Sequence, residues 1–414
     1  MLVFVLNQHS KPLMPCKPSK AKKLLKASKA KVVNRTPFTI SLLFGSSGYK
    51  QPITAGMDTG SQKIGVAAIA NGQVIYQSEI EIRQDISKKM QQRQMYRRTR
   101  RGRKTRYRPA RWLNRASMRQ NGRLAPSVQS KVHSHLREKR FVESLLPVTA
   151  WHVETAHFDI HKIVNPDVSG KAYQEGEQKG FYNVKAYVLH RDGYKCKSGQ
   201  KGNHSKKLHV HHIQFKSNGG TDIPSNLITL CETCHDALHL GEFELKTRKT
   251  KTKHATEMGI IKSQLIKSDW DFAETFGYET KFKREQVLQL PKTHYNDAIA
   301  ISCEEGELVK PLGQVLYKKH IAKGDYQQTT GKRSEKTIPT GKLFGLKKFD
   351  LVSTSFGIGF IKGKRSSGYF ALMDIFNNTV TASVNVKKYC QRLTARTGTL
   401  IQEVAIPPLS PIGT

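Results

Sequence analysis

A compact block of histidines and cysteines interrupts a set of three acidic residues that lie on apolar segments far apart in the sequence. The acids are Asp58, Glu154 and Asp297. The block lies between the second and third acids and reads His209-Val-His211-His212, then Asn226, then Cys231-x-x-Cys234-His235-x-x-x-His239. This nesting places two candidate metal-dependent centres in one chain, and 414 residues suffice for the two or three domains of an α/β multidomain protein.

The charge of the chain restricts its partners. Its 414 residues include 70 lysines and arginines against 32 aspartates and glutamates, a net charge of +38. This excess predicts a polyanionic partner, because neutralised phosphates release counterions. A protein with merely solvated basic faces is the less favoured alternative.

Three further observations predict where in the cell the protein is found. No stretch reaches the roughly 18 apolar residues that a membrane span needs, so we expect no membrane partner. The short apolar run Leu2–Leu6 lacks the basic segment of a secretory signal. Six cysteines are too few for a disulfide framework, which predicts a reducing, cytoplasmic location.

Residues 86–137 contain 17 lysines and arginines and no acidic residue. A helix here would be polar on all sides and would have no reason to lie on a protein core. We therefore expect it to lie along a nucleic acid backbone; a disordered basic segment is the alternative. The residues expected to contact nucleic acid are Arg97, Arg98, Arg100, Arg101, Arg103, Arg106, Arg108, Arg111 and Trp112.

The three acids are expected at the ends of regular elements. Asp58 follows the apolar run that starts at Ile53, and Glu154 ends a short strand within 147–160. Asp297 falls in the first turns of a helix over 294–303. Three carboxylates that converge would repel one another unless divalent cations lay between them.

Other segments have weaker patterns. We expect strands at 2–6, 32–33 and 38–44 around a basic helix at 17–30, with a turn at 11–15. A helix is expected over 262–276 and a strand over 287–290. Residues 305–414 contain short β-branched and aromatic runs with glycine-containing turns, which indicates a small barrel.

The His/Cys block can bind metal and activate water. His211 and His212 are neighbours on an expected strand, so their side chains point to opposite faces and have different tasks. His235 and His239 are spaced i and i+4, which places two imidazoles on one helical face.

This block resembles the HNH endonuclease family with its ββα-metal fold. The resemblance implies that His212 is the general base, His211 a metal ligand and Asn226 a residue that braces the fold. His235 and His239 match the end of the motif, where relatives use both residues as ligands or only one. Mg²⁺ is the expected catalytic ion.

Cys196, Cys231 and Cys234 look like part of a structural zinc knuckle around this motif. The first arm reads Cys196-Lys-Ser-Gly199 instead of Cys-x-x-Cys, so one ligand is missing. His204 or His209 could supply it, or the zinc could be absent.

The separated acids resemble the RNase H-like core of the RuvC family. Gly56-Met-Asp58-Thr, Val153-Glu154-Thr and His294-Tyr-Asn-Asp297-Ala match its three motifs. The resemblance implies two Mg²⁺ ions held by the carboxylates. His294, one turn before Asp297, would act as a base or proton shuttle; a surface histidine without a catalytic role is the alternative.

The whole order resembles the IscB family of transposon-associated nucleases. An N-terminal module with Pro12-Leu-Met-Pro15 precedes a RuvC-like core split in three, an arginine-rich bridge helix and an HNH insert. The expected domains are 1–52 (N-terminal module), 53–85 (RuvC part I), 86–137 (bridge), 138–171 (RuvC part II), 172–245 (HNH), 246–304 (linker and RuvC part III) and 305–414 (β-rich C-terminal module).

Membership of this family would imply an RNA-guided DNA endonuclease in a prokaryotic, nucleoid-associated setting. The protein would be a monomer bound to a guide ωRNA and would cut double-stranded DNA beside a short adjacent motif read by residues 305–414. HNH would cut the guide-paired strand and RuvC the displaced strand. The alternatives are a guide-free homing or junction-selective nuclease and a non-cleaving RNA- and DNA-binding regulator.

Overall fold

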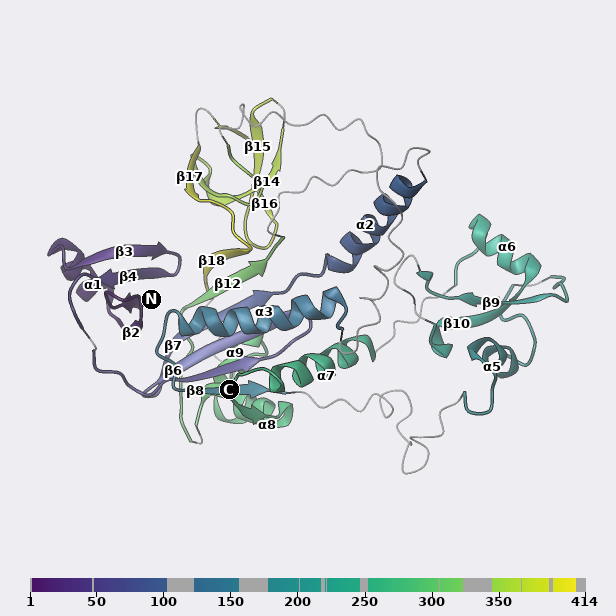
Figure 1. Cartoon of the computed structure of the whole chain (residues 1–414), viewed down its shortest axis with the longest axis horizontal. Coiled ribbons are helices and arrows are strands. Elements are labelled where there is room, and N and C mark those ends of the chain that lie inside the picture. Colours follow the sequence, from purple (N-terminus) through teal and green to yellow (C-terminus); the bar gives the residue numbers. More distant parts are fainter. Residues whose placement is uncertain are drawn as a thin grey trace, which may run out of the picture. The chain divides into compact units, whose positions relative to one another are not determined.

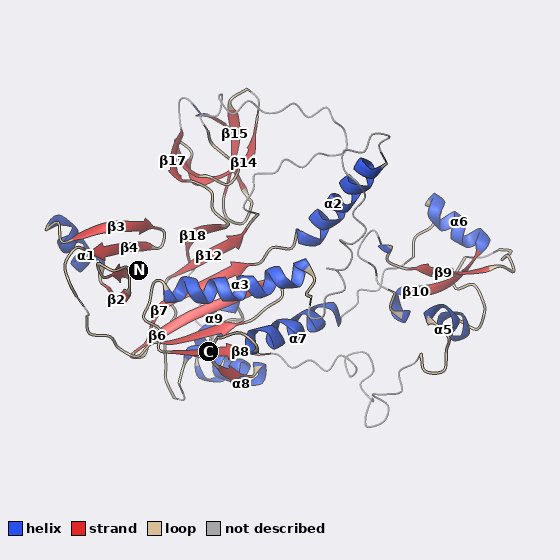
Figure 2. Cartoon of the chain, viewed as in Figure 1, coloured by secondary structure: helices blue, strands red, loops and turns tan. Residues whose placement is uncertain are grey.

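The computed structural model describes residues 2–46, 48–102, 123–155, 178–200, 202–216, 220, 222–245, 252–304, 306–322, 345–365, 367–386 and 390–406. The chain divides into two compact units, one of Met1–Ala156 with Ile260–Thr414 and one of His157–Gly259. Helices and strands are mixed along the sequence (Figure 1; Figure 2), which confirms the mixed α/β class. No helix in the described ranges is long and apolar enough to cross a membrane.

The N-terminal module is a four-stranded sheet with one helix packed on it. Its elements are β1 (Val3–Leu6), β2 (Pro12–Cys16), α1 (Pro18–Lys26), β3 (Ala30–Arg35) and β4 (Phe38–Leu42), and the strand order is β2-β1-β4-β3. Val5, Leu13 and Ile40 pack with Ala21 of α1 in its core. The turn expected at 11–15 is wrong, because Leu13 is buried there and the segment pairs with β1.

A seven-stranded sheet forms the centre of the larger unit. Its strands are β5 (Thr54–Asp58), β6 (Lys63–Ala70), β7 (Gln73–Glu81), β8 (Ala150–Glu154), β11 (Ala273–Thr275), β12 (Gln314–His320) and β18 (Thr399–Ala405), in the order β11-β8-β5-β6-β7-β12-β18. β5, β6 and β7 form an antiparallel meander, and β8 and β11 continue from β5 in parallel. β12 runs parallel to β7 and pairs with β18, so two strands of the expected C-terminal module belong to this sheet.

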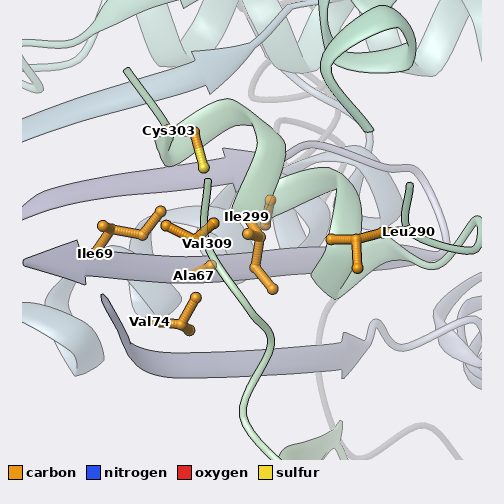
Figure 3. Close-up of a cluster of buried hydrophobic side chains, with 8 residues drawn as sticks. Ala67, Ile69, Val74, Leu290, Ile299, Cys303 and Val309 are labelled. Atoms are coloured by element: carbon orange, nitrogen blue, oxygen red, sulfur yellow. The ribbon is translucent and has the colours of Figure 1, made fainter. Parts of the chain in front are cut away.

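Helices cover both faces of this sheet. On one face, α9 (His294–Ser302) forms a buried core with the strands, shown in Figure 3 with Ala67, Ile69, Val74, Leu290, Ile299, Cys303 and Val309. On the other face, Glu138 of α3 (Pro126–Glu143) accepts a hydrogen bond from Tyr76 Oη at 3.0 Å. Tyr76 pairs with Ala68, whose side chain points away from that of Ala67. The middle layer is therefore buried on both sides, which explains the long buried runs of β6 and β7.

The basic segment 86–137 divides into two different helices. On α2 (Ile86–Arg101), the side chains of Lys88, Arg93, Arg97 and Arg98 are exposed, whereas α3 buries a stripe of helical spacing that includes Val128, Val132 and Val142. The expected boundary between bridge and core at 137 and 138 therefore falls inside α3. The boundary falls there because the buried stripe packs the whole of α3 against the rest of the protein.

The segment before α9 departs most from expectation. α7 (Thr252–Ile266) ends ten residues earlier than the helix expected over 262–276, and β11 occupies the end of that range. Next come α8 (Gly277–Phe282) and a π-helical turn at Lys283–Val287, where a strand was expected over 287–290. That turn is helical because Leu288 N–H and Leu290 N–H bond back to the carbonyl oxygens of Lys283 and Arg284.

The C-terminal region contains a separate five-stranded antiparallel sheet. Its strands are β13 (Leu351–Thr354), β14 (Gly357–Lys364), β15 (Tyr369–Met373), β16 (Thr379–Asn385) and β17 (Cys390–Thr394), in the order β16-β15-β14-β13-β17. Phe370 and Val384 belong to one core cluster, and Phe360 packs in another with Leu400 of β18. The expected small barrel is wrong for the strands described, because they form an open sheet with two covered faces.

The smaller unit is built on the β-hairpin β9 (Leu208–His212) and β10 (Leu227–Cys231). α5 (Val184–Arg191) precedes the hairpin, and α6 (Glu232–Leu240) follows β10 directly. α6 ends at Gly241, whose positive φ of 82° suits a residue without a side chain. The two strands and α6 place every histidine and cysteine of the block in one small domain.

Candidate catalytic and metal centres

The three acids predicted from the sequence lie together where β5 and β8 end. Asp58 and Glu154 are partners in the register of these parallel strands. Asp297 lies in the first turn of α9, which contacts β5 and β6. The sheet and one helix thus bring together residues that are up to 239 positions apart in sequence.

Two glycines allow α9 to approach the sheet this closely. A Cβ at Gly65 would lie 1.8 Å from the His294 carbonyl oxygen, and one at Gly56 would lie 2.4 Å from Ser302 Oγ. Gly65 is the register partner of Asp58, so the closest approach occurs beside the acid itself. Any side chain at Gly65 would push the first turn of α9 away from Asp58.

The carboxylates disturb one another electrostatically. Burial, together with the Asp58 and Asp297 carboxylates, raises the pKa of Glu154 to about 7. Burial also raises the pKa values of Asp58 and Asp297. Ionising all three carboxylates together costs free energy, and bound divalent cations would offset that cost. Carboxylate oxygens suit Mg²⁺ and Mn²⁺ as ligands.

His294 lies directly against this centre. Its Nδ1 is 2.6 Å from Asp58 Oδ2, and the bond to Asp58 raises the pKa of the imidazole. Thr293 caps α9 by accepting a hydrogen bond from Asn296 N–H at 3.2 Å, which fixes the start of the helix that carries His294. The histidine is positioned to hold or move a proton beside Asp58.

Two residues of this centre were not predicted from the sequence. Arg284 Nε lies 2.6 Å from Asp297 Oδ1, and its side chain is 5% exposed. Thr280 of α8 makes a side-chain hydrogen bond to Glu154. Neither belongs to a motif, and only the path of the chain through α8 and the π-helical turn brings them to the acids.

A second centre consists of three histidines in the smaller unit. One ligand nitrogen each from His211, His235 and His239 lies within 4.8 Å of the others. His211 Nε2 and His239 Nε2 are 3.3 Å apart. Burial and the two neighbouring imidazoles lower the pKa of His211 to about 4, so it is neutral at physiological pH, as a metal ligand must be. Three imidazoles suit a transition metal ion better than the expected Mg²⁺.

His212 points to the other side of β9, away from these ligands. Its Nε2 lies 2.7 Å from Asp222 Oδ1, and Lys216 Nζ lies 2.9 Å from the same oxygen. Asp222 was missed in the sequence because it is a loop residue at no fixed spacing from the motif. The arrangement gives His212 a carboxylate partner at hydrogen-bond distance, which fixes the direction of its ring.

Asn226 braces the chain that follows His212. Its Oδ1 accepts a hydrogen bond from Gln214 N–H at 2.9 Å, and its Nδ2 donates one to Gln214 O at 3.1 Å. The side chain is buried and joins the start of β10 to the end of β9. This geometry fixes the backbone on the carboxyl side of His212.

A third cluster contains cysteine thiols. Ligand atoms of Cys196, His204, Cys231 and Cys234 lie within 4.8 Å of one another, and His204 Nδ1 is 3.5 Å from Sγ of both Cys231 and Cys234. Burial opposes ionisation of Cys231, but hydrogen bonds from Cys234 N–H and His204 outweigh it and lower the pKa to about 6. Three cysteine sulfurs and one imidazole are a ligand set of the kind that holds structural zinc.

Of the two candidates for the fourth ligand, His204 lies in this cluster. His209 instead stacks on His235, with 5.1 Å between ring centroids. The departure from Cys-x-x-Cys at Cys196 therefore does not leave the set incomplete.

The predicted nucleic acid contacts are only partly described. Arg97 and Arg98 are exposed on α2, and the backbones of Arg100 and Arg101 continue that helix. Arg103, Arg106, Arg108, Arg111 and Trp112 lie outside the described residues.

Two family models match parts of the chain. A family model described as RRXRR protein matches residues 3–176, and one described as HNH endonuclease matches residues 195–240. The second range contains the whole His/Cys block, so the predicted HNH endonuclease domain is confirmed. No curated protein matches the chain. An RRXRR region joined to an HNH domain supports a nuclease of the IscB and Cas9 type that acts on nucleic acid.

Proposed function

We propose that the protein is an RNA-guided DNA endonuclease of the IscB type that cuts the two strands of its target at two different centres. One observation carries the proposal: two constellations suited to phosphodiester hydrolysis, of different chemistry, lie in separate compact units of one chain. The His212 centre would cut the guide-paired strand. The centre of Asp58, Glu154 and Asp297 would cut the displaced strand.

The strand order supports a RuvC-like core. An antiparallel meander β7-β6-β5 followed by parallel strands β8 and β11 is the arrangement expected of an RNase H-like sheet, with acids at the ends of the first and fourth strands. The family model that covers residues 3–176 includes both of these strands. The third acid comes from a helix on the sheet, as the sequence motif at 294–298 requires.

At the three-acid centre, the chain supplies ligands and a proton acceptor. Asp58, Glu154 and Asp297 would hold two Mg²⁺ ions, which when bound supply charge stabilisation on the scissile phosphate. His294 is placed to accept a proton from the attacking water and is steadied by Asp58. Arg284 holds one oxygen of Asp297 and so fixes the direction of the other.

At the HNH centre, the residues on the two faces of β9 would have different roles. His211, His235 and His239 would hold a single divalent ion that stabilises charge on the phosphate and the leaving oxygen. His212 on the opposite face takes the proton from water, and Asp222 orients its imidazole. Asn226 holds the strand end that carries His212.

Guide RNA is the partner that best accounts for the charge. A net charge of +38 exceeds what a short DNA site would neutralise, whereas a large structured RNA and a DNA duplex together would use it. Arg93, Arg97 and Arg98 of α2 are exposed, and the helix would lie along the guide backbone, reading shape instead of sequence. The five-stranded sheet would contact the RNA and the target-adjacent motif.

The test is a strand-resolved cleavage assay. The protein is purified from a host that also carries and expresses its flanking genomic DNA. We expect one structured RNA with a variable end to co-purify and to direct cleavage of both strands of a matching duplex. His212→Ala should leave only the displaced strand cut, and Asp58→Ala only the guide-paired strand.

Other outcomes would decide against the proposal. Cleavage of both strands by either single variant would contradict the assignment of centres. Efficient cleavage by RNA-free protein would favour a guide-free homing or junction-selective nuclease. Binding without cleavage under any metal condition would favour a regulator.

A further inference from the structure

An aromatic surface lies beside the three-acid centre, on α8 and the residue before it. Phe276, Tyr278 and Phe282 are 38%, 71% and 61% exposed. The rings of Phe276 and Tyr278 are nearly parallel, with 5° between their planes and 6.0 Å between their centroids. Clustered exposed apolar surface of this kind marks an interaction site more often than a solvated face.

The Tyr278 ring and the backbone of Phe276 are held in place before any partner binds. The Glu279 carboxylate accepts a hydrogen bond from Phe276 N–H at 3.3 Å and another from Tyr278 Oη at 3.0 Å. One side chain therefore fixes both the backbone before α8 and the direction of the tyrosine ring. A pre-organised surface loses little conformational entropy on binding.

The surface adjoins the acids directly. Gly277, between the two stacked rings in sequence, faces Glu154: a Cβ at this position would lie 3.1 Å from Glu154 Oε1. Thr280, on the same helix, makes a hydrogen bond to Glu154. A strand whose phosphate lies at the acids therefore has its neighbouring nucleotides beside α8.

A cavity of about 760 Å³ continues from these rings. Tyr278 and Phe282 line it together with Lys283, Glu304 and Glu307. Carboxylates repel phosphates but accept hydrogen bonds from the exocyclic amino groups of bases. The lining therefore favours a nucleotide that turns its base inward and its phosphate outward.

We propose that Phe276, Tyr278 and Phe282 form a stacking platform for unpaired bases of the displaced DNA strand and hold its register at the three-acid centre. This inference rests on the proposed function. Aromatic platforms bind single strands because every unpaired base has a free π-face, which a base inside a duplex lacks. The displaced strand is the unpaired strand that this centre is proposed to cut, whereas the other DNA strand is paired to the guide.

The binding test uses the Asp58→Ala protein with its guide RNA and a target duplex. 2-Aminopurine replaces one base at a time along the displaced strand, and its fluorescence reports stacking. We expect quenching at the nucleotides next to the cleavage position, and recovery when Tyr278→Ala and Phe282→Ala are added. Tyr49→Ala, an exposed tyrosine of the N-terminal region, is the matched control and should leave the quenching intact.

The cleavage test uses the same aromatic double variant with Asp58 restored. Its displaced-strand cleavage should fall by roughly fivefold or more, the loss expected from one stacked base. Cleavage of the guide-paired strand should stay normal and shows that the variant is folded. Unchanged displaced-strand cleavage, or quenching only of probes placed in the guide RNA, would overturn the inference alone. A wild-type protein that never cuts the displaced strand would overturn the proposed function as well.

Discussion

Arg284 Nε lies 2.6 Å from Asp297 Oδ1, which makes a buried guanidinium the partner of one oxygen of the three-acid centre. The same guanidinium donates to Leu290 O at 3.2 Å and to Glu285 Oε1 at 2.7 Å. Arg284 sits in the π-helical turn at Lys283–Val287, an irregularity often found at functional sites. Because this contact occupies Asp297 Oδ1, the proposed cation would bind Asp297 through Oδ2.

We predict that Arg284→Met raises the Mg²⁺ concentration needed for half-maximal displaced-strand cleavage by about 10- to 100-fold, because residues that orient metal ligands have effects of this size. Arg284→Lys should be intermediate, since an ammonium group keeps the charge but loses the planar fork. The measurement is a Mg²⁺ titration of strand-resolved cleavage, with the guide-paired strand as internal control. A lowered Mg²⁺ requirement would mean that Arg284 competes with the cation instead of positioning its ligand.

His204 and His209 provide a matched pair for testing the thiol cluster. We predict that Co²⁺-substituted wild-type protein and the His209→Ala variant show thiolate charge-transfer absorption, whereas His204→Ala loses most of it. Structural zinc contributes on the order of 10 kcal/mol to the folding of small domains. The smaller unit of His204→Ala should therefore also unfold at a lower temperature. Equal cobalt spectra in both variants would remove His204 from the ligand set.

The positions of the proposed catalytic residues could be predicted from the sequence because each sits in a local motif on a regular element. Asp58 ends an apolar strand, and Asp297 follows a helix start that Thr293 caps. The opposite faces of His211 and His212 followed from strand geometry alone. Motifs of this kind carry their spacing in the sequence, so one chain suffices to find them.

The supporting residues could not be predicted, because tertiary packing selects them. Arg284 and Thr280 reach the acids only through α8 and a π-helical turn, and neither element has a periodic pattern. β12 and β18 join the central sheet across an intervening module, and strand pairing at such distance leaves no local signal. The boundary expected after residue 137 falls inside α3, whose lysines and arginines masked a buried stripe in the sequence.

The two proposed centres should differ in their choice of metal. Three imidazoles favour transition metals such as Mn²⁺, Co²⁺ and Ni²⁺, whereas three carboxylates favour Mg²⁺ and Mn²⁺. We predict that Co²⁺ or Ni²⁺ alone supports cleavage of the guide-paired strand but little of the displaced strand, and that Mn²⁺ supports both. The assay is strand-resolved cleavage after chelation and replacement with each ion. If the ratio of guide-paired to displaced-strand cleavage is the same with Mg²⁺, Mn²⁺, Co²⁺ and Ni²⁺, the two centres do not have different ligand chemistries.

His135 makes the stability of α3 depend on pH. It is fully buried, its Nδ1 donates to Lys131 O at 2.8 Å, and burial lowers its pKa from 6.5 to about 4. The unfolded chain therefore binds more protons between those values, so stability is complete above pH 6.5 and falls as the pH drops toward 4. At pH 5 the loss from this residue should be about 2 kcal/mol. Hydrogen exchange of α3 amides at pH 7 and 5 should show a smaller loss in His135→Gln; an equal loss would contradict the assignment.

Lys318 and Glu138 form a buried ion pair between β12 and α3, and their side chains are 1% and 2% exposed. Burial lowers the pKa of Lys318 to about 8 although Glu138 favours its charged form. Removing one partner leaves an uncompensated charge, so we predict that Lys318→Met lowers the opening free energy of α3 by about 3–5 kcal/mol. The double variant with Glu138→Leu should recover most of this loss, since apolar pairs of similar volume replace buried ion pairs at little cost. Hydrogen exchange of α3 amides in the single and double variants measures both values. If the loss of opening free energy in the double variant equals the sum of the losses in the two single variants, the two residues act independently. The ion pair then does not stabilise the packing of α3 on the sheet.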